Sequence, residues 1–301
     1  MTQSTIGFCC STDQGKAQAE FSKTGTGMEP PISGPDDVSN LMIKSIPETA
    51  LPYILKVFNL VWVRSFLHNK WRTATIIPIP KPGKDHSNPG NYWPISLTSC
   101  LCKTLEKMIN WRLVEYMENN KIFSEIQCGF RKYRSTADHL IRMDTFIRKG
   151  FATEEKVISI FFDMEKAYDK TWRYGIMRDL HEAGLRGRMP MFIDKILESC
   201  LFQVKLQQNH STLRTQESGV PQGSTISVTL FAIKINSLSR VIPREIQASV
   251  FVDDVQIAYS HHDLNKAQRV LQESVNSIAN WALMNGFSFS TSKMVVMHFI
   301  K

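Results

Sequence analysis

Two adjacent aspartates between apolar arms are the residues of this sequence most suited to metal chemistry. Asp253 and Asp254 stand at the centre of the stretch from Ala248 to Tyr259. The arms predict the two strands of a hairpin, whose two-residue turn favours Asn-Gly or Asp-Gly because glycine adopts positive φ freely. The pair Asp-Asp does not match that preference, and it places two negative charges side by side. A bound cation would explain them, and a solvated loop tip is the competing interpretation.

A third aspartate ends a buried strand about ninety residues earlier. Val157–Phe162 is apolar and β-prone, and Asp163 follows it directly. If the two strands pair, the three carboxylates converge. Mg²⁺ prefers hard oxygen ligands and leaves room for phosphate oxygens, and two such ions roughly 3.5–4 Å apart stabilise an in-line phosphoryl transfer. The chemistry that these residues predict is therefore metal-assisted phosphoryl transfer.

The elements around the aspartates predict an α+β architecture. From residue 157 onward the expected order is strand, helix, helix, hairpin, helix and short strands, an antiparallel sheet with helices on one face. The individual segments are a helix from Asp169 to about Ala183, a helix over about 225–239, a helix capped by Asp263 and ended by Gly286, and strands over 287–290 and 294–299 that flank Lys293.

Upstream of this layer, a pair of strands is joined by a basic loop. Trp71–Pro80 and Asn91–Ser96 are β-prone, and Lys81 and Lys84 lie in the turn between them. Such a finger could grip phosphate, although a Lys-Pro-Gly-Lys turn is more often simply solvated. Further along, Phe130–Arg134 forms a basic, aromatic cluster before a helix whose capping box is Ser135 and Asp138. It could contact a nucleic-acid backbone or only face water.

Composition points to a globular protein with a polyanionic partner. The chain has 301 residues, 43% of them hydrophobic, and its longest apolar run, Leu51–Val63, is too short to span a bilayer. No apolar signal segment opens the chain, so we expect a soluble intracellular protein without a membrane part. The net charge is +8, and all of it lies in Arg64–Lys149, which has 15 Lys and Arg against 7 Asp and Glu. A segregated surplus of this kind suits nucleic acid.

Several ordered motifs resemble those of reverse transcriptases. Phe162–Asp169, Gly219–Ser224, Phe251–Asp254 and Gly286–Lys293 are similar to the palm motifs. Ile77–Asp85, Asn91–Leu97 and Gln127–Arg131 with Ser135-Thr136 are similar to the fingers motifs of the non-LTR retrotransposon branch, of the jockey-like arthropod kind. The resemblance runs from about Gly34 to the end of the chain. It implies a basic fingers-like part over 34–150 and a catalytic palm over 151–301. Residues 1–33 lack periodicity and contain several Gly and Pro residues, which predicts a flexible lead-in.

The resemblance implies a role for each matched residue. Asp163, Asp253 and Asp254 would hold two Mg²⁺ ions, with Mn²⁺ as a substitute. Tyr168 would stack under the incoming sugar and exclude a 2′-hydroxyl, and Lys293 would protonate the pyrophosphate leaving group. Gln222 and Gly223 would lie against template and nucleotide, and Lys81 and Lys84 would approach the triphosphate. The partners implied are an RNA template, a DNA primer and dNTPs, and the implied place of action is the nucleus.

Two positions depart from the family pattern. The fingers motif usually carries Arg where this chain has Trp93, and a neutral indole cannot supply the charge that grips the triphosphate. Val228 stands where proline commonly opens the following helix. The sequence runs to Lys301, directly after the last palm motif, and we expect the thumb to be missing. We therefore expect a truncated RNA-directed DNA polymerase domain with impaired activity.

Two other functions stay open at this stage. An RNA-templated RNA polymerase also carries an acidic hairpin and an upstream aspartate, but it must admit the 2′-hydroxyl that Tyr168 would exclude. A catalytically dead remnant could bind nucleic acid through the basic surplus alone. Comparing dNTP with NTP incorporation distinguishes an RNA polymerase from a reverse transcriptase. Nucleic-acid binding without primer extension would indicate the remnant.

Overall fold

The computed structural model describes residues 33–198 and 200–300, so that the predicted lead-in lies, up to residue 32, outside the described residues. The chain forms two compact units. The first comprises the described residues up to Tyr116 together with Leu180–Ser227, and the second comprises Met117–Asp179 and the described residues from Val228 onward. The predicted division at about residue 150 concerns the fingers and palm and stays a prediction.

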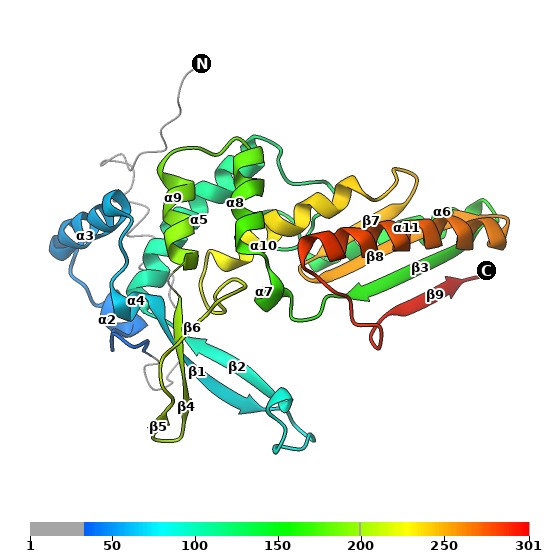
Figure 1. Cartoon of the computed structure of the whole chain (residues 1–301). Coiled ribbons are helices and arrows are strands. Elements are labelled where there is room, and N and C mark those ends of the chain that lie inside the picture. The colour runs from blue at the N-terminus through cyan, green and yellow to red at the C-terminus, as the bar shows by residue number, and fades with distance from the viewer. Residues whose placement is uncertain (1–32, 199, 301) are drawn as a thin grey trace. The chain divides into compact units, whose positions relative to one another are not determined.

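The first unit is built around a sheet in the order β2-β1-β4-β5, with β6 also paired to β4 (Figure 1). The predicted strand pair on either side of the basic loop is confirmed, because β1 and β2 pair antiparallel. β1 also pairs with β4 in parallel, across more than a hundred residues of chain. The strands are β1 (Thr73–Pro80), β2 (Tyr92–Leu97), β4 (Leu201–Leu206), β5 (Asn209–His210) and β6 (Arg214–Thr215).

The first unit also contains several helices. In α5, apolar residues recur every four positions, and Leu105, Ile109 and Leu113 among them are fully buried. Trp62 of α3 contacts Phe192 of α9, with ring centroids 5.2 Å apart. The helices are α2 (Asn40–Lys44), α3 (Leu51–Arg64), α4 (Asn69–Arg72), α5 (Cys100–Asn119) and α9 (Arg188–Glu198), with α8 (Arg173–Glu182) passing from one unit to the other.

The second unit is an antiparallel sheet in the order β7-β8-β3-β9. Its strands are β3 (Lys156–Asp163), β7 (Gln247–Phe251), β8 (Asp254–His261) and β9 (Val295–Phe299). Its helices are α6 (Thr136–Ala152), α7 (Ala167–Lys170), α10 (Ser227–Ile235) and α11 (Leu264–Asn285). Both hydrogen bonds of the predicted capping box at Ser135 and Asp138 open α6.

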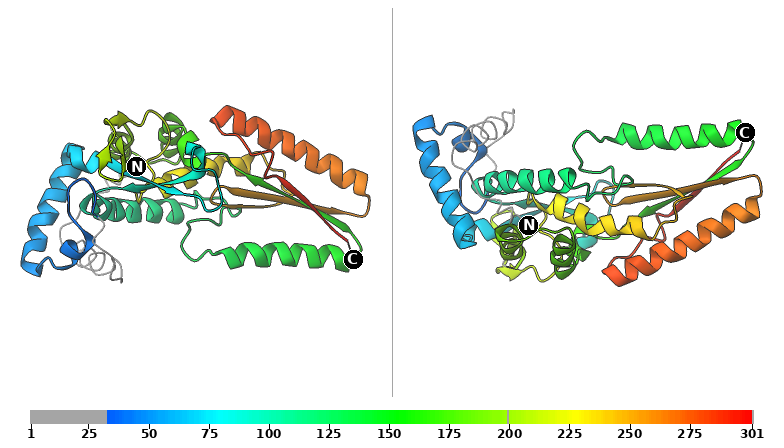
Figure 2. Two further views of the ribbon diagram at one scale, coloured as in Figure 1. Left: turned by 90° about the horizontal axis from the view of Figure 1, so that it is seen from below. Right: turned by 90° about the horizontal axis from the view of Figure 1, so that it is seen from above.

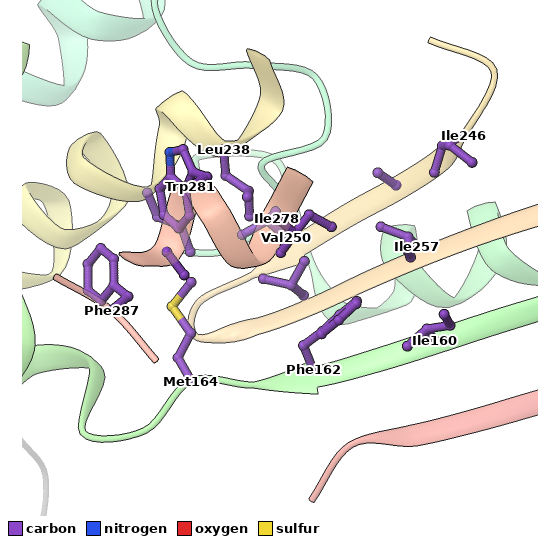
Figure 3. Packing of buried hydrophobic residues seen from close by; sticks show 14 of the residues in the cluster. Ile160, Phe162, Met164, Leu238, Ile246, Val250, Ile257, Ile278, Trp281 and Phe287 are labelled. Carbon is purple, nitrogen blue, oxygen red and sulfur yellow. The ribbon is translucent and has the colours of Figure 1, made fainter. Parts of the chain in front are cut away.

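The two faces of this sheet differ in chemistry. Alternate residues of β3, β7 and β8, among them Ile160, Phe162 and Ile257, form an apolar core with α11, as Figure 3 shows. The opposite face carries buried polar side chains, and Gln256 donates a 2.8 Å hydrogen bond to Ser159 there. The helix α6 runs along that face (Figure 2). The mixed α and antiparallel β class is confirmed, and α10 and α11, which follow residue 157, pack in the same apolar core. The polar residues of the other face are buried under α6, which precedes that stretch of the chain.

Two predicted segments differ in detail. The helix expected from Asp169 to Ala183 is interrupted after Lys170, so that α7 and α8 are separate. The strand expected over 287–290 is reduced to one bridge between Met164 and Phe289. Among the residues that the structure describes, no helix has the length and apolar character needed to cross a membrane.

Candidate active site

The turn between β7 and β8 carries the acidic pair. Phe251 pairs with Asp254, so the two turn residues are Val252 and Asp253, and Asp254 already begins β8. The turn expected at Asp253-Asp254 is therefore displaced by one residue. Val252 has φ 59°, a region that β-branched residues rarely adopt. Sequence patterning missed this because Val252 has the apolar, branched side chain typical of a strand.

Asp163 and Asp254 lie opposite each other in the register of β3 and β8. Directly opposed residues of an antiparallel pair share one face of the sheet, with Cβ atoms about 4.5–5.5 Å apart. Asp253 is tied to the same place, because its carbonyl accepts a hydrogen bond of 3.3 Å from the Met164 backbone N–H. The structure thus brings the three predicted metal ligands together at one end of the sheet.

Negative charge accumulates at this end. Partial burial and the charges of Asp253 and Asp163 raise the pKa of Asp254 above its ordinary value. The Lys293 ammonium lies 3.0 Å from Asp163 Oδ2 and 3.2 Å from Oδ1, and this contact raises the pKa of Lys293. One lysine among three carboxylates leaves a net negative cluster, which favours a cation.

The donor set fits Mg²⁺ shared with a substrate better than a closed protein site. Among the described residues, no three His, Cys, Asp or Glu side chains form a group that could hold a metal ion. Mg²⁺ is usually bound by one or two carboxylates together with substrate phosphates, and seldom by an all-protein cage. The carboxylates at this end of the sheet carry a net negative charge, and they could bind Mg²⁺ together with substrate phosphates in this way.

Tyr168 lies beside this cluster at the start of the second unit's aromatic stack. Its half-buried ring stacks on Phe231 with centroids 5.4 Å apart and 16° between the planes. Phe231 in turn contacts Phe287, which stacks on Trp281. Burial, with the charge of Asp253 as a smaller cause, raises the pKa of Tyr168 to about 12, so its hydroxyl stays neutral. The ring is held firmly by its neighbours.

The remaining predicted site residues belong to the first unit. Gly223 has φ +86°, and a Cβ there would lie 2.9 Å from the carbonyl oxygen of Ser96, so the position requires glycine. Gln222, beside it, is partly buried. Lys81 donates a 3.0 Å hydrogen bond to the carbonyl of Gly90 and so fastens its own loop, while Lys84 is exposed. Trp93 lies in β2 opposite Ile79 and is 51% exposed.

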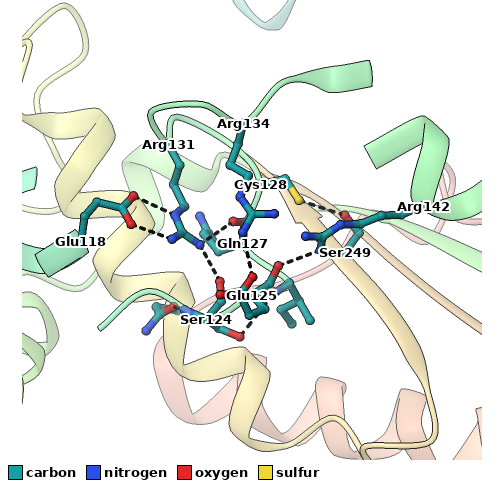
Figure 4. A network of polar contacts seen from close by, with 11 residues as sticks. Glu118, Ser124, Glu125, Gln127, Cys128, Arg131, Arg134, Arg142 and Ser249 are labelled. Atoms are coloured by element: carbon teal, nitrogen blue, oxygen red, sulfur yellow. Dashed lines mark hydrogen bonds and ion pairs between the residues drawn. The ribbon is translucent and has the colours of Figure 1, made fainter. Parts of the chain in front are cut away.

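Both arginines of the basic cluster Phe130–Arg134 are engaged within the protein, as Figure 4 shows, whereas Lys132 and Tyr133 are exposed. Arg131 forms a bidentate ion pair with Glu118, with bonds of 2.9 and 2.6 Å. Arg134 forms an ion pair of 2.7 Å with Glu125. Both arginines hold the loop, a role that neither of the two interpretations of this cluster included, and a nucleic-acid contact by the cluster stays a prediction. The acidic partners are 13 and 9 residues away along the chain, beyond the range of local sequence patterns.

Two residues near the acidic turn, His139 and Gly129, were not among the predicted site residues. His139 of α6 contacts the Ser249 hydroxyl, and Ser249 also donates to Cys128 Sγ. Gly129 packs so closely on the turn that a Cβ would lie 2.3 Å from the backbone nitrogen of Val252. A glycine inside a motif was the available hint of such a close approach.

Comparison with known proteins decides the family. Residues 79–300 match the family described as reverse transcriptase (RNA-dependent DNA polymerase). The chain belongs to the reverse transcriptase family. The predicted jockey-like resemblance is confirmed as well, because the chain is 32% identical over 257 residues to the "Probable RNA-directed DNA polymerase from transposon BS" of Drosophila melanogaster. It is 26% identical over 255 residues to the RNA-directed DNA polymerase from the mobile element jockey of the same species.

These similarities cover most of this reverse transcriptase chain and a minor part of its relatives. The two Drosophila alignments span 82% and 83% of the chain but 28% of each relative. Among solved structures, telomerase from Candida albicans in complex with a TWJ fragment of telomeric RNA matches with a TM-score of 0.57 at 13% identity, covering 83% of this chain and 46% of that one. At that identity the likeness shows the reverse transcriptase fold.

Proposed function

We propose that this chain is an RNA-directed DNA polymerase domain that adds dNTPs to a primer 3′-hydroxyl. The observation that carries the proposal is the pairing of Asp163 with Asp254, with Asp253 in the adjoining turn, in a chain of the reverse transcriptase family. An RNA template, a DNA primer and dNTPs are the proposed partners. The RNA fragment in the related telomerase structure is consistent with a nucleic-acid template. A nuclear site of action stays a prediction.

The three aspartates have a proposed role as ligands. Asp163, Asp253 and Asp254 would hold two Mg²⁺ ions, or Mn²⁺, whose chemistry is to stabilise the attacking and leaving oxygens of the transfer. Because β3 and β8 place two carboxylates on one sheet face, the chain presents them to the same substrate phosphates. The raised pKa of Asp254 indicates that its charged form is disfavoured without a positive charge nearby, which favours binding of a cation.

Lys293 and Tyr168 have proposed roles on the substrate. Lys293 stays protonated beside Asp163, which is the state that a general acid for the pyrophosphate needs. Tyr168 would reject a 2′-hydroxyl by its bulk, because the ring is fixed on Phe231 and cannot easily move away. We further propose that Gln222 and Gly223 contact template and nucleotide, that Lys81 and Lys84 approach the triphosphate, and that the fingers and palm divide at about residue 150.

Primer extension tests the proposal. The chain is incubated with poly(rA)/oligo(dT), dTTP and Mg²⁺, and extension is expected to fall by at least about 100-fold in Asp253→Asn. Asp263→Asn is the matched control, since Asp263 caps α11 away from the acidic turn. Template-dependent extension that survives in Asp253→Asn would contradict the assignment. Nucleic-acid binding by the unmutated chain with no extension would indicate a remnant that only binds.

A further inference from the structure

A carboxylate is buried in α5, apart from the acidic cluster. Glu106 is 6% exposed. On α5 it lies beside Leu105 and Ile109, which are both fully buried. Burying an ionisable carboxyl is costly unless its oxygens accept hydrogen bonds. Nothing in the proposed chemistry uses Glu106, so its contacts must explain its presence.

Both oxygens of Glu106 accept hydrogen bonds, and one of them holds a distant loop. Oε2 accepts 2.9 Å from the Ser224 hydroxyl and 2.6 Å from the Thr225 backbone N–H. Oε1 accepts 3.7 Å from the Cys102 thiol one turn earlier in α5. Ser224 and Thr225 directly follow Gln222 and Gly223, and lie more than a hundred residues from Glu106 in the chain.

The same loop is confined on its other sides. Gly223, at φ +86°, lies so close to the Ser96 carbonyl that no side chain fits, and its own carbonyl accepts 3.4 Å from the Thr98 hydroxyl. Pro221 is held by the Ser227 hydroxyl at 2.8 Å. These contacts limit where the loop can go, and Glu106 adds two hydrogen bonds that meet at one carboxyl oxygen, from a side chain and from the backbone.

We propose that Glu106 is a positioning residue that sets where the Gln222-Gly223 loop presents itself to nucleotide and template. This inference rests on the proposed polymerase function. A displacement of about 1 Å in a group that positions a substrate can reduce catalytic efficiency by up to about 100-fold. Because Glu106 lies beneath the loop and is buried, it acts through Ser224 and Thr225 and does not touch the substrate.

The test compares two replacements of Glu106. Glu106→Leu keeps the volume and removes both acceptors, whereas Glu106→Gln keeps one acceptor oxygen that can still reach Thr225. In primer extension we expect Glu106→Leu to raise the KM for dTTP by about 10-fold with a smaller change in kcat. In Glu106→Gln the KM should stay close to that of the unmutated chain. Glu115→Gln, an exposed carboxylate on the same helix, should leave both constants unchanged.

Amide hydrogen exchange measures the loop directly. The Thr225 amide should exchange at least about 10-fold faster in Glu106→Leu and close to the unmutated rate in Glu106→Gln. If Glu106→Leu does not fold, Ser224→Ala removes one of the two loop contacts and should raise the KM for dTTP in the same direction. Unchanged Thr225 exchange, or an unchanged KM in a folded variant that polymerises, overturns the role of Glu106. Absence of extension by the unmutated chain overturns the proposed function instead, and the exchange measurement then still decides whether Glu106 holds the loop.

Discussion

Tyr168 is the residue at which sugar selection can be measured. Its ring is stacked on Phe231 and its hydroxyl is neutral, so its effect on a nucleotide is steric. In Tyr168→Ala we expect the preference for dTTP over UTP in kcat/KM to fall by at least about 10-fold, because the obstacle to the 2′-hydroxyl is gone. Single-nucleotide extension on poly(rA)/oligo(dT) measures the ratio.

The matched variant for this prediction is Tyr168→Phe. It keeps the ring and its contact with Phe231 and removes only the hydroxyl, so the ratio of dTTP to UTP should stay close to that of the unmutated chain. A fall in selectivity in Tyr168→Phe would show that a hydrogen bond of the hydroxyl, and not the bulk of the ring, selects the sugar.

Trp93 is one of the two positions at which we expect this chain to depart from the pattern of its family. The exposed indole in β2 has no charge to offer a triphosphate. A charge-assisted hydrogen bond contributes about 1.5–3 kcal/mol, so Trp93→Arg should lower the KM for dTTP by about 10-fold or more. Trp93→Leu serves as the control for loss of the indole alone. A KM that is the same in Trp93→Arg and in the unmutated chain would show that this position does not grip phosphate.

His139 makes the second unit sensitive to acid. Burial, together with the nearby Arg142, lowers the pKa of His139 below its ordinary value of 6.5, although the charge of Asp254 opposes this. Below about pH 6.5 the unfolded chain therefore binds this proton before the folded chain does. The stability that the neutral His139 contributes is fully present above that pH. It is lost as the pH falls towards the lowered pKa of His139 in the folded chain. Thermal melting between about pH 7.5 and about pH 5.5 should show a smaller drop in Tm in His139→Gln than in the unmutated chain; an equal drop in both would contradict this.

At the scale of elements, a loop braces the acidic turn. The backbone of residues 126–129 pairs with Val250 of β7 through bonds of 2.8, 2.8 and 3.3 Å, and Gly129 packs on the nitrogen of Val252. Arg131 fixes the end of this loop to Glu118 and also donates to the carbonyls of Ser124 and Gln127. The unusual φ of Val252 persists because its surroundings hold it.

A single methyl group tests the brace. In Gly129→Ala the new Cβ would be 2.3 Å from Val252 N, so the turn that carries Asp253 must move. We expect extension to fall by at least about 10-fold while nucleic-acid binding changes little. Gly90→Ala is the control, because its Cβ would meet only the flexible side chain of Asn88, at 3.2 Å. Equal activity in the two variants would show that the brace does not position the turn.

Elements with local signals were predictable from the sequence. The helix α11 begins where the Asp263 side chain accepts from the Asn265 N–H and ends where Gly286 adopts φ 77°. The capping box of α6 is equally local, since its residues are three apart. Asp163 and the acidic pair were identifiable for a similar reason, because a charged residue that interrupts an apolar strand stands out within a window of ten.

What the sequence did not predict depends on partners far along the chain. The two-residue strands β5 and β6 exist only through pairing with β4, and β4 depends in turn on β1. The turn register was missed because Val252 is held by Gly129, more than a hundred residues earlier. Glu106 gave no functional signal, since a glutamate in a helix is unremarkable until its buried contacts with Ser224 and Thr225 are known.

At the scale of the whole chain, the distribution of charge predicts how nucleic acid binds. All of the +8 net charge lies in Arg64–Lys149. Within that segment Arg131, Arg134 and Arg148 form ion pairs with acidic residues of the same segment. Those pairs are neutral, so the excess positive charge must be carried by other cations there, among them the exposed Lys84. Binding driven by such cations releases counterions from the nucleic acid and weakens with salt.

Salt dependence of binding is therefore the test at this scale. The affinity of the chain for an RNA–DNA duplex should fall by at least about 10-fold between about 50 and about 200 mM salt, and Asp253→Asn should bind as tightly as the unmutated chain. If Lys84 contacts a phosphate, Lys84→Gln should reduce the slope of log K against log salt by about 0.7–0.9. Arg148→Gln, which removes a cation already paired with Asp144, should leave the slope nearly unchanged. An affinity that does not change with salt would mean that the basic segment is not the binding surface, and equal slopes in the two variants would exclude Lys84 from it.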